Sequence, residues 1–257
     1  MPQPPIHERD LIVGLQKGLA IIQLFTEETP RLSVADVARL AGLTRSAARR
    51  FLLTLVHDGY AQTDSRQYWL TAKTLRIGQA YVDSARLPRM LRPIVEKVAS
   101  ETREHVSVAV LDGDEVVHIV RSRIANVSSM SIRQGYRLPM YCTGSGRLWL
   151  ASLPDDEVDA YLARVERKPL TPFTRTSVDE IKAIVAQIRE QGYVELDQEY
   201  EVGMRILGVP LTNRAGQMCA SLTITTQVSS LSLDDIRERC LRYLYEGQAL
   251  LRPIIDM

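Results

Sequence analysis

The chain has 257 residues, a length that accommodates two domains of about 100–200 residues each. Its formal net charge is only +1, and a near-neutral total, taken alone, argues against a nucleic-acid-binding protein. No apolar run approaches the roughly 18 residues of a membrane span, and the opening residues lack the layout of a signal peptide. The cysteines (Cys142, Cys219 and Cys240) are widely spaced, which indicates reduced thiols. We therefore expect a soluble, cytoplasmic protein that has no membrane partner.

The charge is distributed unevenly along the chain. Residues 31–76 hold eight Lys and Arg against three Asp and Glu, a net charge of +5, so the remaining residues carry −4. A basic module joined to a slightly acidic one is typical of a DNA-binding unit coupled to a unit that does not touch DNA.

The chain opens with a Pro-rich, polar tail, residues 1–10, for which we predict disorder. Apolar residues at helical spacing then predict a helix over 11–25. Ser33 stands where a helix N-cap is expected, with Asp36 three residues later, as in a capping box. A short helix follows, and Gly42 supplies a residue that can turn with positive φ.

A second helix begins after Thr44, its predicted N-cap, and has apolar positions from Ala48 to Leu55 on one face. Two short helices around one glycine form a helix-turn-helix. The front of the second helix leaves polar side chains on the outward face, where such motifs contact bases and phosphates. The candidate DNA-binding residues here are Ser33, Thr44, Arg45, Ser46, Arg49 and Arg50.

Two β-prone runs, at 60–63 and 67–70, flank a turn-rich tip at 64–66. Together with the helices they predict a winged helix-turn-helix domain over 11–72. Arg66, at the tip, is the further candidate for contact with the DNA backbone or the minor groove. A winged scaffold that does not bind DNA is the alternative.

A further helical pattern covers 71–86, and Pro88 disfavours helix at the residue before it. We therefore place the domain joint at Leu87 and Pro88, with a linker helix over 73–88 and a second domain over 89–257.

Helical and strand patterns alternate in this second domain, and turn residues such as those at 112–114 separate neighbouring strands. The pattern predicts an α+β domain with a mostly antiparallel sheet. We predict helices over about 91–98, 146–153, 155–163, 178–191 and 233–251, strands over 106–111, 115–121, 127–132, 206–211 and 218–225, and a connection over 135–139.

Enzyme motifs are missing from the sequence. It contains no G-x-S-x-G, no H-E-x-x-H, no phosphate-binding G-K-[ST] loop and no G-x-G-x-x-G. The histidines lack metal-ligand spacing, so we interpret His7, His57, His105 and His118 as surface or packing residues. We expect no catalytic residue, no metal and no cofactor. An enzyme or storage protein with a vestigial winged helix is the rival interpretation.

Thr143, Gly144, Ser145 and Gly146 open a predicted helix. Glycines let the backbone approach a ligand, and free N–H groups at a helix start favour an anion. A tight turn before a packed helix explains the same residues equally well.

Thr223 and Thr225 lie two apart on a predicted strand, so both hydroxyls point to one face, and Leu222 and Ile224 point to the other. Polar residues on a face that should be core suggest a polar pocket. An edge strand with an exposed polar face is the alternative.

Three blocks in a fixed order resemble the IclR family of bacterial transcriptional regulators. They are residues 18–22 leading into 32–60, residues 135–139 followed by 143–146, and residues 191–193, 197–199, 203–206 and 220–225. Residues 43–55, with 111–115 and 197–199, are similar to the Pca/Pob branch, which controls aromatic-acid catabolism through the β-ketoadipate pathway.

The resemblance implies a winged helix-turn-helix, a linker helix and a GAF-like effector domain, acting as a homodimer or tetramer on palindromic promoter DNA, with RNA polymerase as a further partner. It implies an effector pocket built from Leu138, Thr143, Gly144, Ser145, Asp197, Ile206, Thr223 and Thr225. The chain departs from the family pattern at Tyr141 and Cys142, and where it has threonine in place of serine on the strand. These departures leave the identity of the effector open.

We therefore interpret the chain as a ligand-responsive transcriptional regulator of aromatic-acid catabolism, with a small carboxylate such as protocatechuate or 4-hydroxybenzoate as effector. The alternative is a repressor of another carboxylate pathway, for glyoxylate or a sugar acid.

Overall fold

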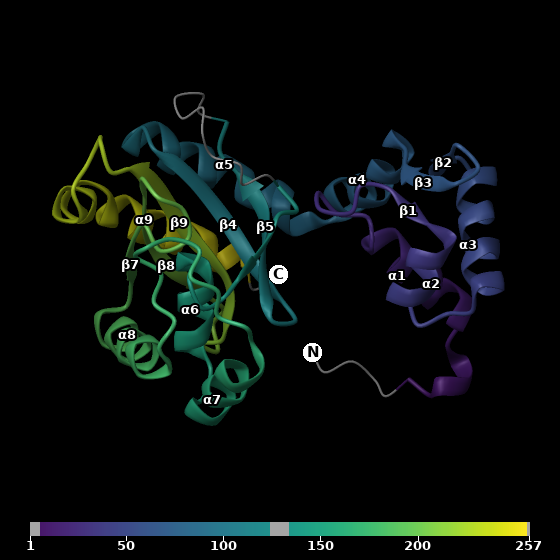
Figure 1. Cartoon of the computed structure of the whole chain (residues 1–257). Helices are drawn as coiled ribbons and strands as arrows, with labels where there is room; N and C mark the ends of the chain where they lie inside the picture. The colour runs from purple at the N-terminus through teal and green to yellow at the C-terminus, as the bar shows by residue number, and fades with distance from the viewer. Residues whose placement is uncertain (1–5, 124–133, 256–257) are drawn as a thin grey trace. The chain divides into compact units, whose positions relative to one another are not determined.

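The structure, a computed structural model, describes residues 6–123 and 134–255. The chain divides into two compact units, Met1–Ser84 and Ala85–Met257 (Figure 1).

The first unit is a winged helix. Its elements are η1 (Glu8–Asp10), α1 (Val13–Gln23), β1 (Leu32–Ser33), α2 (Val34–Leu40), α3 (Arg45–His57), β2 (Ala61–Thr63), β3 (Gln67–Leu70), η2 (Ala72–Thr74) and α4 (Leu75–Ser84). The three strands form an antiparallel sheet in the order β1-β3-β2. Buried apolar side chains from the helices and β3, among them Ile21, Ala48, Leu52 and Tyr68, form one core.

Local chemistry explains why the two central helices start where they do. The Ser33 side chain accepts a hydrogen bond from the Asp36 amide, and the Asp36 carboxylate accepts one from the Ser33 amide, which completes the predicted capping box. Gly42 has φ +63°, the left-handed conformation that the turn requires. The predicted helix-turn-helix is confirmed.

Three boundaries in this unit differ from the prediction. In the tail predicted to be disordered, Glu8–Asp10 form one 3₁₀ turn, while residues 1–5 lie outside the described part of the chain. The helix predicted over 11–25 is shorter at both ends. The helix predicted over 71–86 begins as a 3₁₀ turn, because the Thr71 side chain caps Lys73, and becomes α-helical only at Leu75.

The domain joint also lies earlier than predicted, between Ser84 and Ala85. Helix α5 (Arg86–Thr102) contains Pro88 within its first turn. A proline is tolerated there because its missing N–H would have no helical partner. Placing the joint at Leu87 and Pro88 was therefore wrong, and the linker helix ends with α4.

The second unit is a six-stranded antiparallel sheet with helices on both faces. Its remaining elements are β4 (His105–Asp112), β5 (Glu115–Arg121), β6 (Arg137–Pro139), α6 (Gly144–Ser152), α7 (Asp155–Arg164), α8 (Val178–Gln191), β7 (Val194–Asp197), β8 (Met204–Thr212), β9 (Met218–Gln227) and α9 (Leu233–Ile255). The strand order is β6-β5-β4-β9-β8-β7. The α+β prediction is confirmed.

Helices α5 and α9 pack against one face of the sheet, where Val106, Val108, Leu222 and Ile224 join them in the largest core cluster (Figure 1). Helices α6, α7 and α8 contribute to the cores on the other face. Alternation along β9 therefore turns Thr223 and Thr225 toward α6. Because β9 lies in the middle of the sheet, the edge-strand alternative for these threonines is wrong.

Two short strands in this unit differ from the prediction. Residues 137–139, predicted as part of a connection, form β6, which pairs with β5, and β7 was not predicted. The strand predicted over 127–132 lies outside the described residues. Within the described residues, no helix is long and apolar enough to cross a membrane.

Candidate nucleic-acid interface and ligand cavity

Helix α3 presents an unpaired basic face. Thr44 caps it, because its hydroxyl oxygen accepts from the Ala47 amide at 3.2 Å, and buried Ala48 and Leu52 anchor the opposite side. The outward side chains at the front of the helix are all exposed: Arg45, Ser46, Arg49 and Arg50. In the described part of the chain, none of these arginines forms an ion pair, so their donors are available to an anionic partner.

Ser33 has a different role from the arginines. Its hydroxyl donates to the Asp36 carboxylate at 2.7 Å while it accepts from the Asp36 amide, so both functions of the hydroxyl are used within the cap. The Ser33 hydroxyl and the Ser33 amide both donate to the Asp36 carboxylate and lower its pKa. Ser33 therefore positions α2, and the structure does not leave its hydroxyl free for DNA.

The tip of the wing carries Arg66 as an exposed side chain. The Asp64 carboxylate accepts from the amides of Arg66 (2.9 Å) and Gln67 (2.7 Å), and Ser65 has φ +78°, which closes the turn. Beside it, the Arg31 guanidinium stacks over the Trp69 ring at 4.3 Å. A rigid turn thus holds a further cation at the wing.

In the second unit, a small cavity lies between the start of α6 and the sheet. Seven of the eight predicted effector residues line it, together with two that were not predicted. The lining residues are His118, Leu138, Thr143, Gly144, Ser145, Tyr200, Ile206, Thr223 and Thr225. Its free volume is about 20 Å³, close to the room that one water molecule needs.

The start of α6 forms one wall of this cavity. Thr143 is the N-cap, since its hydroxyl accepts from the Gly146 amide at 3.2 Å and donates to the Pro139 carbonyl at 2.7 Å. A Cβ at Gly146 would collide with the Met140 backbone, so this glycine serves close packing. The Gly144 and Ser145 amides, ahead of the capped one, lie in the first turn, where the helix dipole favours an anion. Close packing therefore explains Gly146, whereas anion binding concerns the Gly144 and Ser145 amides of the same turn.

Hydroxyl groups form the floor of the cavity. Thr223 is opposite Ser107 of β4, and their hydroxyls are 3.0 Å apart. Thr225 is equally buried, but its hydroxyl has no hydrogen-bond partner among the described residues. The sheet therefore offers the cavity one satisfied hydroxyl and one available hydroxyl.

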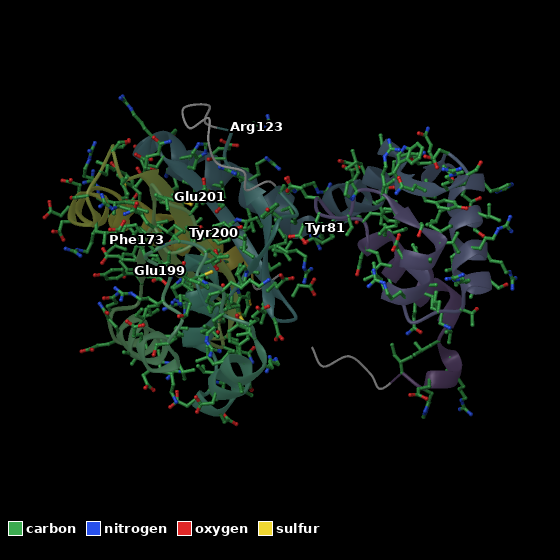
Figure 2. All side chains as sticks on the ribbon, viewed as in Figure 1. Tyr81, Arg123, Phe173, Glu199, Tyr200 and Glu201 are labelled. Carbon is green, nitrogen blue, oxygen red and sulfur yellow. The ribbon has the colours of Figure 1, made fainter. Side chains whose placement is uncertain are left out.

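Tyr200 closes the cavity from the segment between β7 and β8, and Figure 2 labels it next to Glu199. Burial, together with the neighbouring Tyr136, raises the pKa of Tyr200 to about 12, so its phenol is neutral at physiological pH. The adjacent Glu199 carboxylate accepts from Arg147 of α6 at 3.0 Å. This contact connects the Tyr200 segment to the helix that starts at the cavity.

Comparison with known proteins identifies this architecture. Residues 14–65 match the IclR helix-turn-helix domain, and residues 79–246 match the C-terminal domain of bacterial transcriptional regulator IclR. The chain belongs to the IclR family. It is therefore a DNA-binding transcriptional regulator with an effector domain, and not an enzyme.

Two relatives in the IclR family are similar over nearly the whole chain. The Pca regulon regulatory protein of Pseudomonas putida is 35% identical over 91% of this chain and 81% of its own length. The p-hydroxybenzoate hydroxylase transcriptional activator of Acinetobacter baylyi is 31% identical over 97% of this chain and 94% of its own length. The resemblance to the Pca/Pob branch is confirmed.

Solved structures agree with the fold. A transcriptional regulator of Rhodococcus sp. RHA1 has a TM-score of 0.79 and 37% identity, covering 95% of this chain and 98% of its own. The inducer-binding domain of PobR from Acinetobacter, solved as a double mutant with 3-hydroxybenzoic acid, has a TM-score of 0.62 and 26% identity, covering 65% of this chain and 98% of its own.

One residue of the pocket expected from the IclR resemblance lies elsewhere. Asp197 does not line the cavity, because it pairs in register with Arg205 and its carboxylate accepts from the Arg205 guanidinium at 3.0 Å. The neighbouring pair, Leu196 and Ile206, occupies the other face of the strands, and Ile206 reaches the cavity. Assigning Asp197 to the pocket therefore disagrees with this structure.

Two residues of the cavity, His118 and Tyr200, were not predicted. His118 was interpreted as a surface or packing residue, although it stands alone in the apolar run Val116 to Val120. A single histidine within an apolar strand was the signal in the sequence that could have identified His118 as a cavity residue. Tyr200 lies in an irregular segment, where no periodicity in the sequence indicates which way a side chain points.

Proposed function

We propose that this IclR-family regulator controls genes of aromatic-acid catabolism and that its effector is a hydroxylated benzoate. The observation that carries the proposal is the cavity, which combines the first-turn amides of α6 with buried hydroxyls. The relatives support it: one is a regulatory protein of the Pca regulon, another is the transcriptional activator of p-hydroxybenzoate hydroxylase, and a third was solved with a hydroxybenzoic acid.

The effector carboxylate would bind at the first turn of α6. Thr143 already satisfies the Gly146 amide, so the Gly144 and Ser145 amides are the donors that remain for a ligand. The rest of the ligand would lie along the sheet, where Leu138 and Ile206 contact its ring and Thr225 offers a hydroxyl. An anion at the amides and a polar group beyond the ring match a hydroxybenzoate.

The narrowness of the cavity bears on the choice of ligand. A free volume of about 20 Å³ does not hold an aromatic ring, so the lining must move apart when one binds. We propose that the segment between β7 and β8, which carries Tyr200, makes this movement. The same narrowness favours a smaller carboxylate, such as glyoxylate, as the second candidate.

Ligand-induced stabilisation distinguishes these effectors. A ligand that binds only the folded state stabilises it by about 2.7 kcal/mol at a hundred times its dissociation constant. The melting temperature would be measured with 4-hydroxybenzoate, protocatechuate, β-ketoadipate, glyoxylate and the uncharged 4-hydroxybenzyl alcohol. A rise with the hydroxybenzoates but not with the alcohol is expected. A rise with glyoxylate alone would favour the second candidate, and no rise with any of them would overturn the proposed effector class.

We further propose that the regulator binds palindromic promoter DNA in the cytoplasm as a homodimer or tetramer, where it would also meet RNA polymerase. One recognition helix covers only a few base pairs, and two-fold symmetry supplies the second half-site. Large apolar side chains are exposed on α1 (Leu15, Leu19) and on α4 (Leu75, Ile77, Tyr81), which supports these helices as the protomer contact. Tyr81 is labelled in Figure 2. A monomer by light scattering at micromolar concentration, with tight operator binding, would contradict this.

A further inference from the structure

His118 reaches the cavity because of a local irregularity in β5. In the pairing of β4 with β5, Ser107 is opposite Arg121 and Val108 is opposite Val120, but Ala109 is opposite His118, so the register skips Ile119. Without the bulge, Ile119 would face Ala109 and point to the cavity side. Bulges are known to re-aim a side chain in this way. The bulge therefore exchanges an apolar side chain for an imidazole at the cavity.

One ring nitrogen of His118 lacks a hydrogen-bond partner among the described residues. The side chain is buried, and its Nδ1 has no hydrogen-bond partner among the described residues. An unpaired buried polar atom is unusual in a folded protein and carries a free-energy cost. Since His118 lines the cavity, a ligand bound there is a natural partner for this nitrogen.

His118 is also neutral under physiological conditions. Burial, with a smaller contribution from the nearby Arg121, lowers the pKa of His118 to about 4. A neutral imidazole carries one N–H donor and one unprotonated nitrogen that accepts. Such a group pairs well with a hydroxyl, which both donates and accepts.

The position of His118 in the sheet places it across the cavity from the start of α6. A Cβ at Gly144 would collide with Ile206 of β8, so the start of α6 lies against this strand, and β8 is separated from β5 by β9 and β4. Three strand spacings correspond to about 14 Å between the backbones of β5 and β8. Because Gly144 and His118 line the same cavity, a ligand that spans it from the Gly144 amide would have its far end at β5.

We propose that His118 is a specificity-determining residue that hydrogen-bonds the ring hydroxyl of the effector and so selects hydroxybenzoates over benzoate. This inference rests on the proposed function, because it takes a benzoate carboxylate to be bound at α6. A ligand without the hydroxyl leaves the imidazole unpaired, which is why discrimination is expected.

The test compares two ligands in wild-type and variant proteins. Dissociation constants for 4-hydroxybenzoate and benzoate are measured by calorimetry with the wild type, His118→Phe, His118→Gln and the control His57→Gln, which changes an exposed histidine of α3. The wild type and the control should prefer 4-hydroxybenzoate by about tenfold or more. His118→Phe should reduce this preference to about twofold or less, mainly by weakening 4-hydroxybenzoate binding, and His118→Gln should retain part of it.

A measurement on the wild type alone covers the case in which the variants do not fold. With ¹⁵N-labelled histidine, the His118 ring-nitrogen resonances should shift on addition of 4-hydroxybenzoate and stay nearly unchanged with benzoate. Equal weakening of both ligands in His118→Phe, or equal resonance shifts with both, would overturn the role of His118 while leaving the proposed function intact. If the wild type binds neither acid, the proposed function and this inference both fail.

Discussion

Arg147 and Glu199 form an ion pair that is buried on both sides, with the guanidinium Nη2 3.0 Å from the carboxylate Oε2. Arg147 also donates through Nε to the Tyr141 carbonyl, and Glu199 also accepts from the Arg175 amide at 3.1 Å. Burial raises the pKa of Glu199 and lowers that of Arg147, while each charge opposes the shift of the other. The pair ties α6 to the segment that carries Tyr200, so it links two walls of the cavity.

Glu199→Gln should lower the free energy of unfolding by about 3–5 kcal/mol, because it leaves the Arg147 charge buried without a counter-charge. The matched control is Glu180→Gln, which removes one partner of the exposed Arg175–Glu180 pair. That change should cost about 0–1 kcal/mol, since water screens the pair. Urea unfolding at pH 7 measures both. Equal effects of the two variants on the free energy of unfolding would show that the buried pair contributes no more to stability than the exposed pair.

Stability should fall in mild acid because of His118. Its folded pKa of about 4 lies below the ordinary value of 6.5, so the unfolded chain takes up a proton first as the pH drops. At pH 7 the ring is mostly neutral in both the folded and the unfolded state, so it has little effect on the free energy of unfolding. Between about pH 6.5 and pH 4 the folded state loses stability, by about 2 kcal/mol at pH 5. Burial lowers the pKa of His105 as well, so its contribution has the same sign.

The comparison that isolates this effect is the unfolding free energy of wild type and His118→Gln at pH 7 and pH 5. The variant should lose about 2 kcal/mol less than the wild type over this interval. His57→Gln serves as the control, because its ring is exposed. An identical pH dependence in wild type and His118→Gln would mean that His118 is not held neutral.

The winged helix could be predicted from the sequence because its determinants are local. The Ser33 cap, the Gly42 turn and the helical spacing before Leu55 each lie within a few residues of the structure they specify. The short strands β1, β6 and β7 were missed since two to four residues show no clear alternation.

The cavity could be predicted only in part, because the side of the sheet that a side chain faces depends on the register of the strands. Thr223 and Thr225 could be placed by alternation within one strand. The position of Asp197 depends on its pairing with Arg205, and that of His118 on the bulge opposite Ala109. Both are non-local properties of the sheet, which a single sequence does not display.

Arg49→Ala should weaken operator binding. The guanidinium is exposed on α3 and has no ion-pair partner in the described part of the chain, so it is free to reach a base edge or a phosphate. A guanine contact predicts a loss of about 1–3 kcal/mol that is specific to the cognate site. A phosphate contact predicts a similar loss on all sequences and a shallower salt dependence. Binding is measured by fluorescence anisotropy at several salt concentrations.

The control for this prediction is Arg242→Ala, which removes an equal charge from the exposed surface of α9 in the other unit. It should leave operator affinity within about twofold of wild type, a difference of roughly 0.4 kcal/mol. Wild-type affinity in Arg49→Ala, or promoter binding that does not change with salt, would argue against α3 as the DNA-reading helix.

Thr225→Val and Thr223→Val should affect different properties, ligand binding in the first and folding stability in the second, although the two threonines face the same cavity. The Thr225 hydroxyl has no partner among the described residues, so its removal should leave folding stability nearly unchanged and weaken effector binding by about 0.5–1.5 kcal/mol. The Thr223 hydroxyl pairs with Ser107, so its removal leaves a buried Ser107 hydroxyl unsatisfied and should lower the unfolding free energy by about 1–3 kcal/mol. Thermal melts without and with 4-hydroxybenzoate separate the two effects, since only Thr225→Val should reduce the ligand-induced shift while its ligand-free melting temperature stays that of the wild type. If Thr225→Val keeps the full shift, the hydroxyl of Thr225 does not meet the effector.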